Sequence, residues 1–159
     1  MRIALVWMAL FSACSSPQVE RGVLEGALAQ ELRGVTPAGT DWQLEDQLGR
    51  PAVLVFWASW CGPCIEEVPH FNAIVEAYGD RVEVMGINMG EERSIIVDTQ
   101  SRTSMRYATL LDEDKALANA WRVRRLPLLI VVDSEGRIRL RGSASEQELK
   151  VLLDSLVQV

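Results

Sequence analysis

The sequence is poor in the residues that most metal and nucleic-acid sites require. It has one histidine, His70, and its 16 basic residues are all arginine except Lys115 and Lys150. The formal net charge is −6 and no basic run is present, which argues against a nucleic-acid partner. The apolar run from residue 3 to 11 is too short to span a bilayer. The chain has 159 residues and 48% of them are hydrophobic, which predicts one domain with an ordinary core.

Cysteine is also scarce, but two of the three cysteines lie close together. Cys61 and Cys64 follow an apolar run at 52–55, predicted to be a buried strand, and precede a helical pattern at 65–75. Free N–H groups and partial positive charge at a helix N-terminus favour a thiolate over a thiol. We therefore predict that Cys61 is an exposed nucleophile of low pKa and that Cys64, one turn later, is a buried resolving thiol.

The alternative for an isolated CxxC motif is half of a zinc site. Such a site needs a second pair of ligands. The chain offers only one further cysteine, near the N-terminus, and the single histidine. His70 is predicted to be a partly exposed helix residue rather than a ligand. These residues favour redox chemistry and predict no metal site.

The residues around the pair carry a family resemblance. Gly62-Pro63 fits the first turn of a helix, where proline lacks only an N–H that would be unpaired anyway. The run from Trp60 to Cys64, after a hydrophobic strand, resembles thioredoxin. The longer pattern from Phe56, with Glu67 and a proline beyond it, is closer to the TlpA/ResA-type extracytoplasmic thiol-disulfide oxidoreductases.

The resemblance covers roughly residues 31–157 and implies a fold. We expect an α/β, thioredoxin-like fold whose central mixed sheet is flanked by helices, with an N-terminal β-hairpin and an inserted helix. The pattern agrees with this expectation. Hairpin strands are predicted within 32–44, further strands at 81–88, 107–111, 128–133 and 137–141, and helices from about 91 to 102, from 115 to 121 and from 146 onward.

Glu67 is the predicted general acid/base. Thioredoxin has a buried aspartate six residues before its first cysteine, and that position is Val55 here. In the resembled family an acidic residue at the place of Glu67 lies close to the cysteines and assists proton transfer. The alternative is a solvated helix-surface glutamate, as predicted for Glu66. Pro69 is predicted to kink this helix.

Pro127 is the second feature that the resemblance brings to the site. It stands directly before a buried strand, and in the thioredoxin fold this proline is cis and faces the cysteine pair. The backbone of Leu126 would then pair with an extended substrate, while Trp60 shields the cysteines. An ordinary strand-entry proline is the alternative. Nearby arginines 122, 124 and 125 are predicted to bias partner choice or raise the thiolate population, with a solvated loop as the alternative.

The N-terminus is predicted to be a targeting segment. Residues 1–13 have the pattern of a signal peptide, and residues 10–14 resemble the lipobox of bacterial lipoproteins. Cys14 would then be lipidated, residues 14–30 would form the lipidated N-terminus and tether, and residues 31–159 the thioredoxin-like domain. A plain secretory signal with Cys14 as a spare thiol is the alternative. Ser15 favours the outer membrane, where one exists.

Together these patterns predict an extracytoplasmic, periplasmic enzyme that reduces protein disulfides, with no cofactor other than its own cysteine pair. The sequence contains no flavin or nicotinamide site, so electrons would come from a membrane protein of the DsbD/CcdA type. Substrates in cytochrome c maturation or disulfide repair would fit. The rival functions are a disulfide-forming oxidant, against which Gly62-Pro63 argues, and a Cu(I)-handling lipoprotein, which would have CxxxC and a distant histidine. A peroxidase would need a Thr-x-x-Cys arrangement that is absent here.

Overall fold

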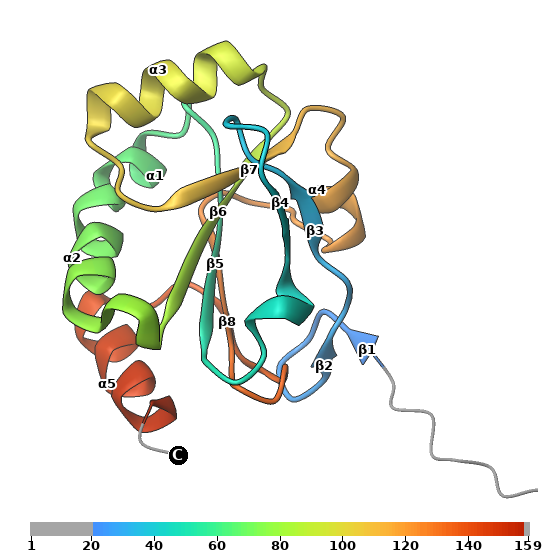
Figure 1. The fold of residues 1–159 in the computed structure, drawn as a ribbon, viewed down its shortest axis with the longest axis vertical. Coiled ribbons are helices and arrows are strands. Elements are labelled where there is room, and N and C mark those ends of the chain that lie inside the picture. The colour runs from blue at the N-terminus through green and yellow to red at the C-terminus, as the bar shows by residue number, and fades with distance from the viewer. Residues whose placement is uncertain (1–20, 158–159) are drawn as a thin grey trace, which may run out of the picture.

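The computed structural model describes residues 21–157. Its centre is a five-stranded sheet in the order β7-β6-β5-β8-β9, in which β5, β6 and β7 run parallel and β8 and β9 antiparallel to their neighbours (Figure 1). The strands are β1 Arg21–Gly22, β2 Leu28–Ala29, β3 Arg33–Val35, β4 Asp41–Gln43, β5 Ala52–Trp57, β6 Glu83–Met89, β7 Ala108–Asp112, β8 Leu128–Val132 and β9 Ile138–Gly142. The α-helices are α1 Gly62–Glu66, α2 Val68–Tyr78, α3 Arg93–Thr103, α4 Ala116–Ala120 and α5 Glu146–Leu156. The 3-10 helices are η1 Leu44–Gln47 and η2 Gly79–Arg81.

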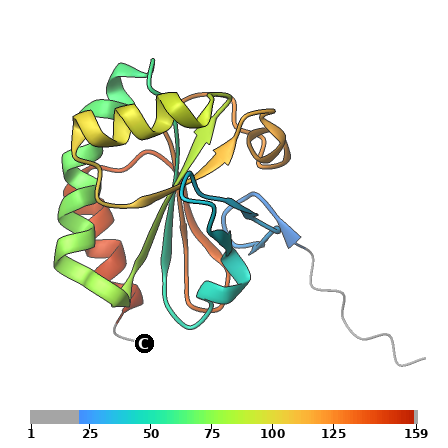
Figure 2. The same cartoon turned by 45° about the horizontal axis from the view of Figure 1, so that its top comes forward.

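All six residues of β5 are buried because both faces of the sheet are covered. Its alternate side chains enter different cores. Leu54 and Phe56 pack with Leu32 and Trp121, whereas Val53 packs with side chains of α2 and α5. In Figures 1 and 2, α2 and α5 accordingly lie on one side of the sheet, and the β3–β4 hairpin and α4 on the other. The expected thioredoxin-like architecture is confirmed, including the N-terminal hairpin and the inserted helix α3.

The helix that follows the cysteines is divided by its proline. Pro69 lacks the N–H that would continue the ladder, and the helix is interrupted at Glu67, between α1 and α2, although the Glu67 backbone keeps right-handed helical angles (φ −83°, ψ −11°). The predicted kink is therefore a short break. The first turn of α2 is instead supported by the carbonyl of Glu67, which accepts the backbone N–H groups of His70 and Phe71 at 3.0 and 3.2 Å.

Part of the predicted tether is structured. Residues 21–29 form the short parallel strands β1 and β2, and Val23 and Ala29 are buried in the main core. The backbone N–H of Ala29 donates to the carbonyl of Gly136 at 2.8 Å, which fastens the segment to the turn before β9. The predicted signal peptide, Cys14 and the first part of the tether lie outside the described residues.

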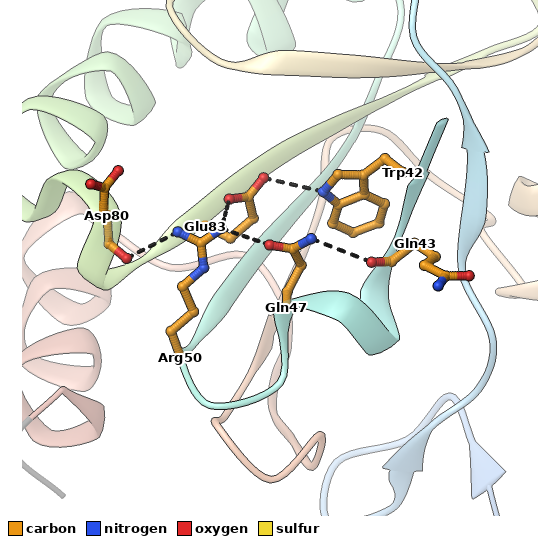
Figure 3. Close-up of polar contacts among 6 residues, drawn as sticks. All are labelled: Trp42, Gln43, Gln47, Arg50, Asp80 and Glu83. Carbon is orange, nitrogen blue, oxygen red and sulfur yellow. Dashed lines mark hydrogen bonds and ion pairs between the residues drawn. The ribbon is translucent and has the colours of Figure 1, made fainter. Parts of the chain in front are cut away.

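A polar network fastens the N-terminal hairpin and η1 to the sheet (Figure 3). Glu83, at the start of β6, accepts a hydrogen bond from Trp42 Nε1 at 3.2 Å and one from Arg50 Nη2 at 2.7 Å. The same guanidinium donates to Gln47 Oε1 and to the carbonyl of Asp80. Segments about forty residues apart in the chain are joined in this way at the end of the sheet where β6 begins.

Candidate active site

Cys61 and Cys64 lie where β5 ends and α1 begins, at the upper edge of the sheet in Figure 1. They form a disulfide, with 5.3 Å between their Cα atoms. A turn closed by the bond from Cys61 N–H to the carbonyl of Ala58, at 3.1 Å, carries the chain from strand to helix. Cys61 is the N-cap of α1, and its Sγ accepts the backbone N–H of Cys64 at 3.3 Å. In the reduced protein this N–H would stabilise a Cys61 thiolate more than a thiol.

We predicted an exposed Cys61 and a buried Cys64, but the two cysteines are buried to a similar degree. Cys61 is 6% exposed and Cys64 is 4% exposed, because both belong to a small apolar cluster with Trp57, Ala58 and Ile96. The expectation of an exposed Cys61 is therefore wrong for the disulfide form. Trp60 was expected to shield the pair, but it is itself 67% exposed, so the burial of the cysteines comes from the cluster beneath them.

The Leu126–Pro127 peptide bond is cis, as predicted. Leu126 is half-buried and packs against the apolar cluster that contains both cysteines. Pro127 immediately precedes β8, whose first residue, Leu128, pairs with Phe56 of β5. The long-range pairing of β8 with β5 therefore brings residues more than sixty positions apart into one site.

Glu67 is placed differently from Glu66. Glu66 is exposed, whereas Glu67 is half-buried at the break between α1 and α2. Burial raises the pKa of the Glu67 carboxyl, and the nearby His70 partly opposes this shift. The pKa of the buried Tyr107 is raised too, first by its burial and then by the charge of Glu67. His70 itself is exposed, and its Nε2 lies 3.7 Å from Glu146.

Glu91 is a site residue to which we assigned no role from the sequence. It is only 9% exposed, and it accepts hydrogen bonds from the backbone N–H and the hydroxyl of Ser59 and from Asn88 Nδ2. Ser59 lies two residues before Cys61, so this carboxylate holds the turn that presents the cysteine. The position of Glu91 in the sequence could have indicated this role. Glu91 follows the strand that runs parallel to β5, and the carboxyl ends of adjacent parallel strands meet at one edge of a sheet.

Metal-binding groups of side chains and membrane-spanning helices are both absent from the described part of the chain. Within residues 21–157, no group of three or more histidine, cysteine, aspartate or glutamate side chains is arranged to hold a metal ion. No helix in the same range is long and apolar enough to cross a membrane. The structure places Leu126 against the apolar cluster that contains both cysteines, with the cis Pro127 next in the chain, and it places Glu67 half-buried three residues after Cys64.

Comparison with known sequences gives a consistent picture. The model of the AhpC/TSA family matches residues 26–141. The thiol-disulfide oxidoreductase ResA of Geobacillus thermodenitrificans is 27% identical over 121 residues, which cover 74% of this chain and 70% of the relative. The thioredoxin-like protein YneN of Bacillus subtilis is 29% identical over 143 residues, covering 85% and 82%.

Solved structures with the same fold are also found. A putative thiol:disulfide interchange protein DsbE from Chlorobium tepidum superposes with a TM-score of 0.79 at 20% identity, covering 86% of this chain and 99% of that one. MTB dsbF, whose structure was described in mixed oxidized and reduced forms, gives a TM-score of 0.72 at 27% identity, covering 79% and 94%. The fold around the cysteine pair is thus shared with proteins that are named for disulfide chemistry.

Proposed function

The chain belongs to the AhpC/TSA family of thioredoxin-like proteins and is a thiol-disulfide oxidoreductase, and we propose that it reduces protein disulfides outside the cytoplasm. The observation that carries the proposal is the Cys61–Cys64 disulfide at the start of α1, with the Cys64 N–H directed at Cys61 Sγ. A sulfur that accepts this hydrogen bond is the better candidate for the attacking thiolate.

The reaction begins from the reduced cysteine pair. The Cys61 thiolate attacks one sulfur of a substrate disulfide, the substrate S–S bond breaks, and its other sulfur leaves and takes up a proton. The Cys64 thiol then loses its proton and attacks Cys61 Sγ in the mixed disulfide, which breaks the bond between Cys61 Sγ and the substrate sulfur; that sulfur leaves as a thiolate and takes up a proton. The products are a substrate dithiol and the enzyme disulfide. Two electrons pass to the substrate, and of its two new protons one balances the proton lost by Cys64 and the other comes from solvent, because Cys61 reacts as a thiolate.

Glu67 is the proposed acceptor of the Cys64 proton. Its carboxyl is half-buried three residues after Cys64, and its raised pKa means that it takes up a proton more readily than an exposed glutamate would. Leu126 and Pro127 form the opposite wall, where the backbone of Leu126 would align an extended substrate segment. Trp60, Gly62 and Pro63 border the pair and would contact the same substrate.

Regeneration of the dithiol requires an external reductant. An exported protein works in an oxidising compartment, so a dithiol of a membrane electron carrier of the DsbD/CcdA type is the proposed donor. The proposed location follows from the signal-like N-terminus and a lipidated Cys14, which would anchor the domain to a membrane, the outer one where it exists. Substrates of cytochrome c maturation fit this setting.

The direction of the reaction can be tested through the reduction potential of the Cys61–Cys64 pair, measured by equilibration with a dithiol buffer. We expect a value near about −270 mV, as in thioredoxin. A value near about −120 mV, as in the strong oxidant DsbA, would contradict the reductase proposal.

The order of attack can be tested separately with two matched variants. We expect that Cys64→Ser accumulates a mixed disulfide with a peptide substrate through Cys61, because no resolving thiol remains. Cys61→Ser should accumulate none and should lose exchange activity. Trapping through Cys64 in the Cys61→Ser protein, identified by peptide mapping, would reverse the assigned roles.

A further inference from the structure

An open pocket beside the active site is lined by arginine side chains. Its volume is about 530 Å³, and it lies between the loop that joins α4 to β8 and the end of β9. Six of its lining residues matter here: Arg122, Arg124, Arg125, Pro127, Leu128 and Arg141. We call it the arginine pocket. It gathers four of the chain's 16 basic residues in one place on a protein whose net charge is −6.

The arginine side chains of this pocket have no ion-pair partner among the residues that the structure describes. No aspartate or glutamate lies among its described lining residues, and none of its four guanidinium groups forms an ion pair with a carboxylate of residues 21–157. One carboxylate lies close. Glu25 Oε1 accepts the backbone N–H of Arg141 at 2.8 Å, which uses the main chain and not the guanidinium.

Arg141 shows most directly that an acceptor is missing. Its Nη2 donates to the carbonyls of Trp121 and Arg122 at 2.8 and 3.3 Å, but its Nη1 is buried and has no hydrogen-bond partner in the described chain. Burial lowers the pKa of this guanidinium, and the charge of Arg122 lowers it further. A buried charged donor without an acceptor costs free energy, so Arg141 is held at the pocket without a compensating carboxylate.

The backbone of Arg122 is also held in an unusual conformation. Its φ is +51°, in the left-handed region that residues other than glycine rarely occupy. The loop therefore accepts a local conformational cost while it places Arg122 at the pocket. The carbonyl of this residue is one of the two that accept Arg141 Nη2.

The Leu126–Pro127 segment connects the arginine pocket to the disulfide site. Leu126 packs on the cluster that contains Cys61 and Cys64, and the next residue, Pro127, lines the pocket. A polypeptide whose cysteine reacts at Cys61 and whose chain passes the cis-proline would therefore extend over the pocket. Carboxylates complement guanidinium groups in geometry as well as in charge, because one carboxylate can accept two parallel N–H bonds from one guanidinium.

We propose that the arginine pocket binds an acidic segment, rich in aspartate or glutamate, that lies close to the reactive cysteine of the protein substrate. This inference rests on the proposed function, because it adds a substrate class to the same site. The carboxylates would pair with the exposed guanidinium groups of Arg122, Arg124 and Arg125 and would bring the substrate disulfide to Cys61. Substrates with such a segment would react faster than neutral ones of the same length.

The test uses two synthetic disulfide peptides of equal length. One carries aspartate and glutamate next to a cysteine, and the other carries asparagine and glutamine at the same positions. The measured quantity is the ratio of their second-order rate constants with the reduced protein. We expect the acidic peptide to react on the order of tenfold faster at low ionic strength, because opposite charges steer association. The ratio should approach one in about 1 M salt, where the Debye length is about 3 Å.

Matched variants decide whether the pocket causes the preference. Arg124→Gln/Arg125→Gln should bring the ratio close to one, and Arg124→Glu/Arg125→Glu should reverse it; both positions are exposed, so folding should persist. The control Arg33→Gln/Arg102→Gln removes two exposed arginines elsewhere and should keep the preference. Using a ratio cancels any general change in Cys61 reactivity.

The outcomes separate this inference from the function beneath it. If the protein reduces neither peptide and also fails to reduce a small uncharged disulfide, the proposed function is overturned. Reduction of both peptides at equal rates would overturn only the acidic-substrate inference. Loss of binding to vesicles of anionic lipid in the pocket variants, with an unchanged peptide ratio, would also overturn it and would assign the pocket to a membrane surface.

Discussion

Single side chains around the disulfide have separate tasks that burial and hydrogen bonding assign. Cys61 Sγ accepts the N–H of Cys64, Glu67 sits half-buried at a helix break, and Glu91 fastens the turn before the cysteines through Ser59. Each of these features involves one side chain and its immediate surroundings. Each can therefore be removed by a conservative substitution that leaves the surrounding fold in place.

Glu67→Gln should change the pH dependence of exchange. If Glu67 takes the Cys64 proton, the variant should resolve mixed disulfides about 100-fold more slowly, the lower end of what general acid–base catalysis contributes. The limb of the pH–rate profile that reports Glu67 should also disappear. Stopped-flow measurement of the resolving step from pH 4 to 9 checks both effects, with the exposed Glu66→Gln as control. An unchanged profile would remove Glu67 from the mechanism.

The raised pKa of Glu67 also predicts an effect on stability. A folded-state pKa above the ordinary 4.5 means that the native protein binds this proton more tightly than the unfolded chain does. The stabilisation is fully present below the ordinary pKa and is lost as pH rises through the raised pKa. The free energy of unfolding of Glu67→Gln, relative to the natural protein, should therefore increase between pH 4 and pH 7. Urea titrations at the two pH values measure it, and a constant difference would contradict the shift.

Glu91→Ala should loosen the active-site turn. The substitution leaves the Ser59 N–H and Asn88 Nδ2 without their acceptor in a buried place, which costs about 1–3 kcal/mol. We expect a lower free energy of unfolding and slower attack by Cys61. Glu92→Ala is the matched control, because its side chain is exposed at the next position. Equal effects of the two substitutions would show that Glu91 does not hold the turn.

At the scale of helices and strands, the predictions came from patterns of a few neighbouring residues, and the structure has helices and strands at the predicted places. The α1–α2 break follows from Pro69, and α5 begins with a capping box in which Ser145 and Glu148 bond reciprocally. Before α4, Asp112 accepts the N–H groups of Leu117 and Ala118. Such caps satisfy donors that a helix end would otherwise leave unpaired.

Ser145→Ala tests the contribution of this cap. The change removes the acceptor of the Glu148 N–H at the start of α5 and should cost about 1 kcal/mol of stability. Thermal or urea unfolding checks the loss. The control is Ser143→Ala, an exposed serine two residues earlier that lies outside the cap. A loss of the same size in the control would show that the capping box does not stabilise α5.

At the scale of the whole molecule, polar contacts attach the N-terminal hairpin to the sheet, and positive charge is concentrated in one region of the surface. The network of Glu83, Arg50 and Trp42 in Figure 3 joins the N-terminal hairpin to β6. The arginine pocket gives one region of an acidic protein the opposite sign. Both features depend on segments that are distant in the chain.

Glu83→Ala should weaken the attachment of the N-terminal hairpin. Trp42 Nε1 and Arg50 would each lose an acceptor in a half-buried place, and we expect a loss of about 1–3 kcal/mol. Glu45→Ala is the comparison, because its ion pair with Arg21 is of similar length but more exposed and should contribute less than about 1 kcal/mol. Urea unfolding followed by tryptophan fluorescence distinguishes them. A larger loss for Glu45→Ala would contradict the ranking.

The sequence by itself determined the parts of this protein that local patterns encode. The CxxC motif at a strand-to-helix corner, the distortion of the helix at Pro69, the C-terminal helix and the cis-proline before β8 were all predicted. Spacing, caps and hydrophobic periodicity act over a few residues, so they can be followed along the chain.

Tertiary structure alone decided what depends on distant partners. Glu91 meets Ser59 across 32 positions, Arg141 of β9 meets the loop of Arg122, and residues 21–29 pack on the domain instead of forming a free tether. The burial of Cys61 likewise depends on Trp57 and Ile96, which no local pattern brings together. These contacts arise only when β5 pairs with β6 and β8 and the helices cover the sheet, because strand pairing determines which loops share an edge.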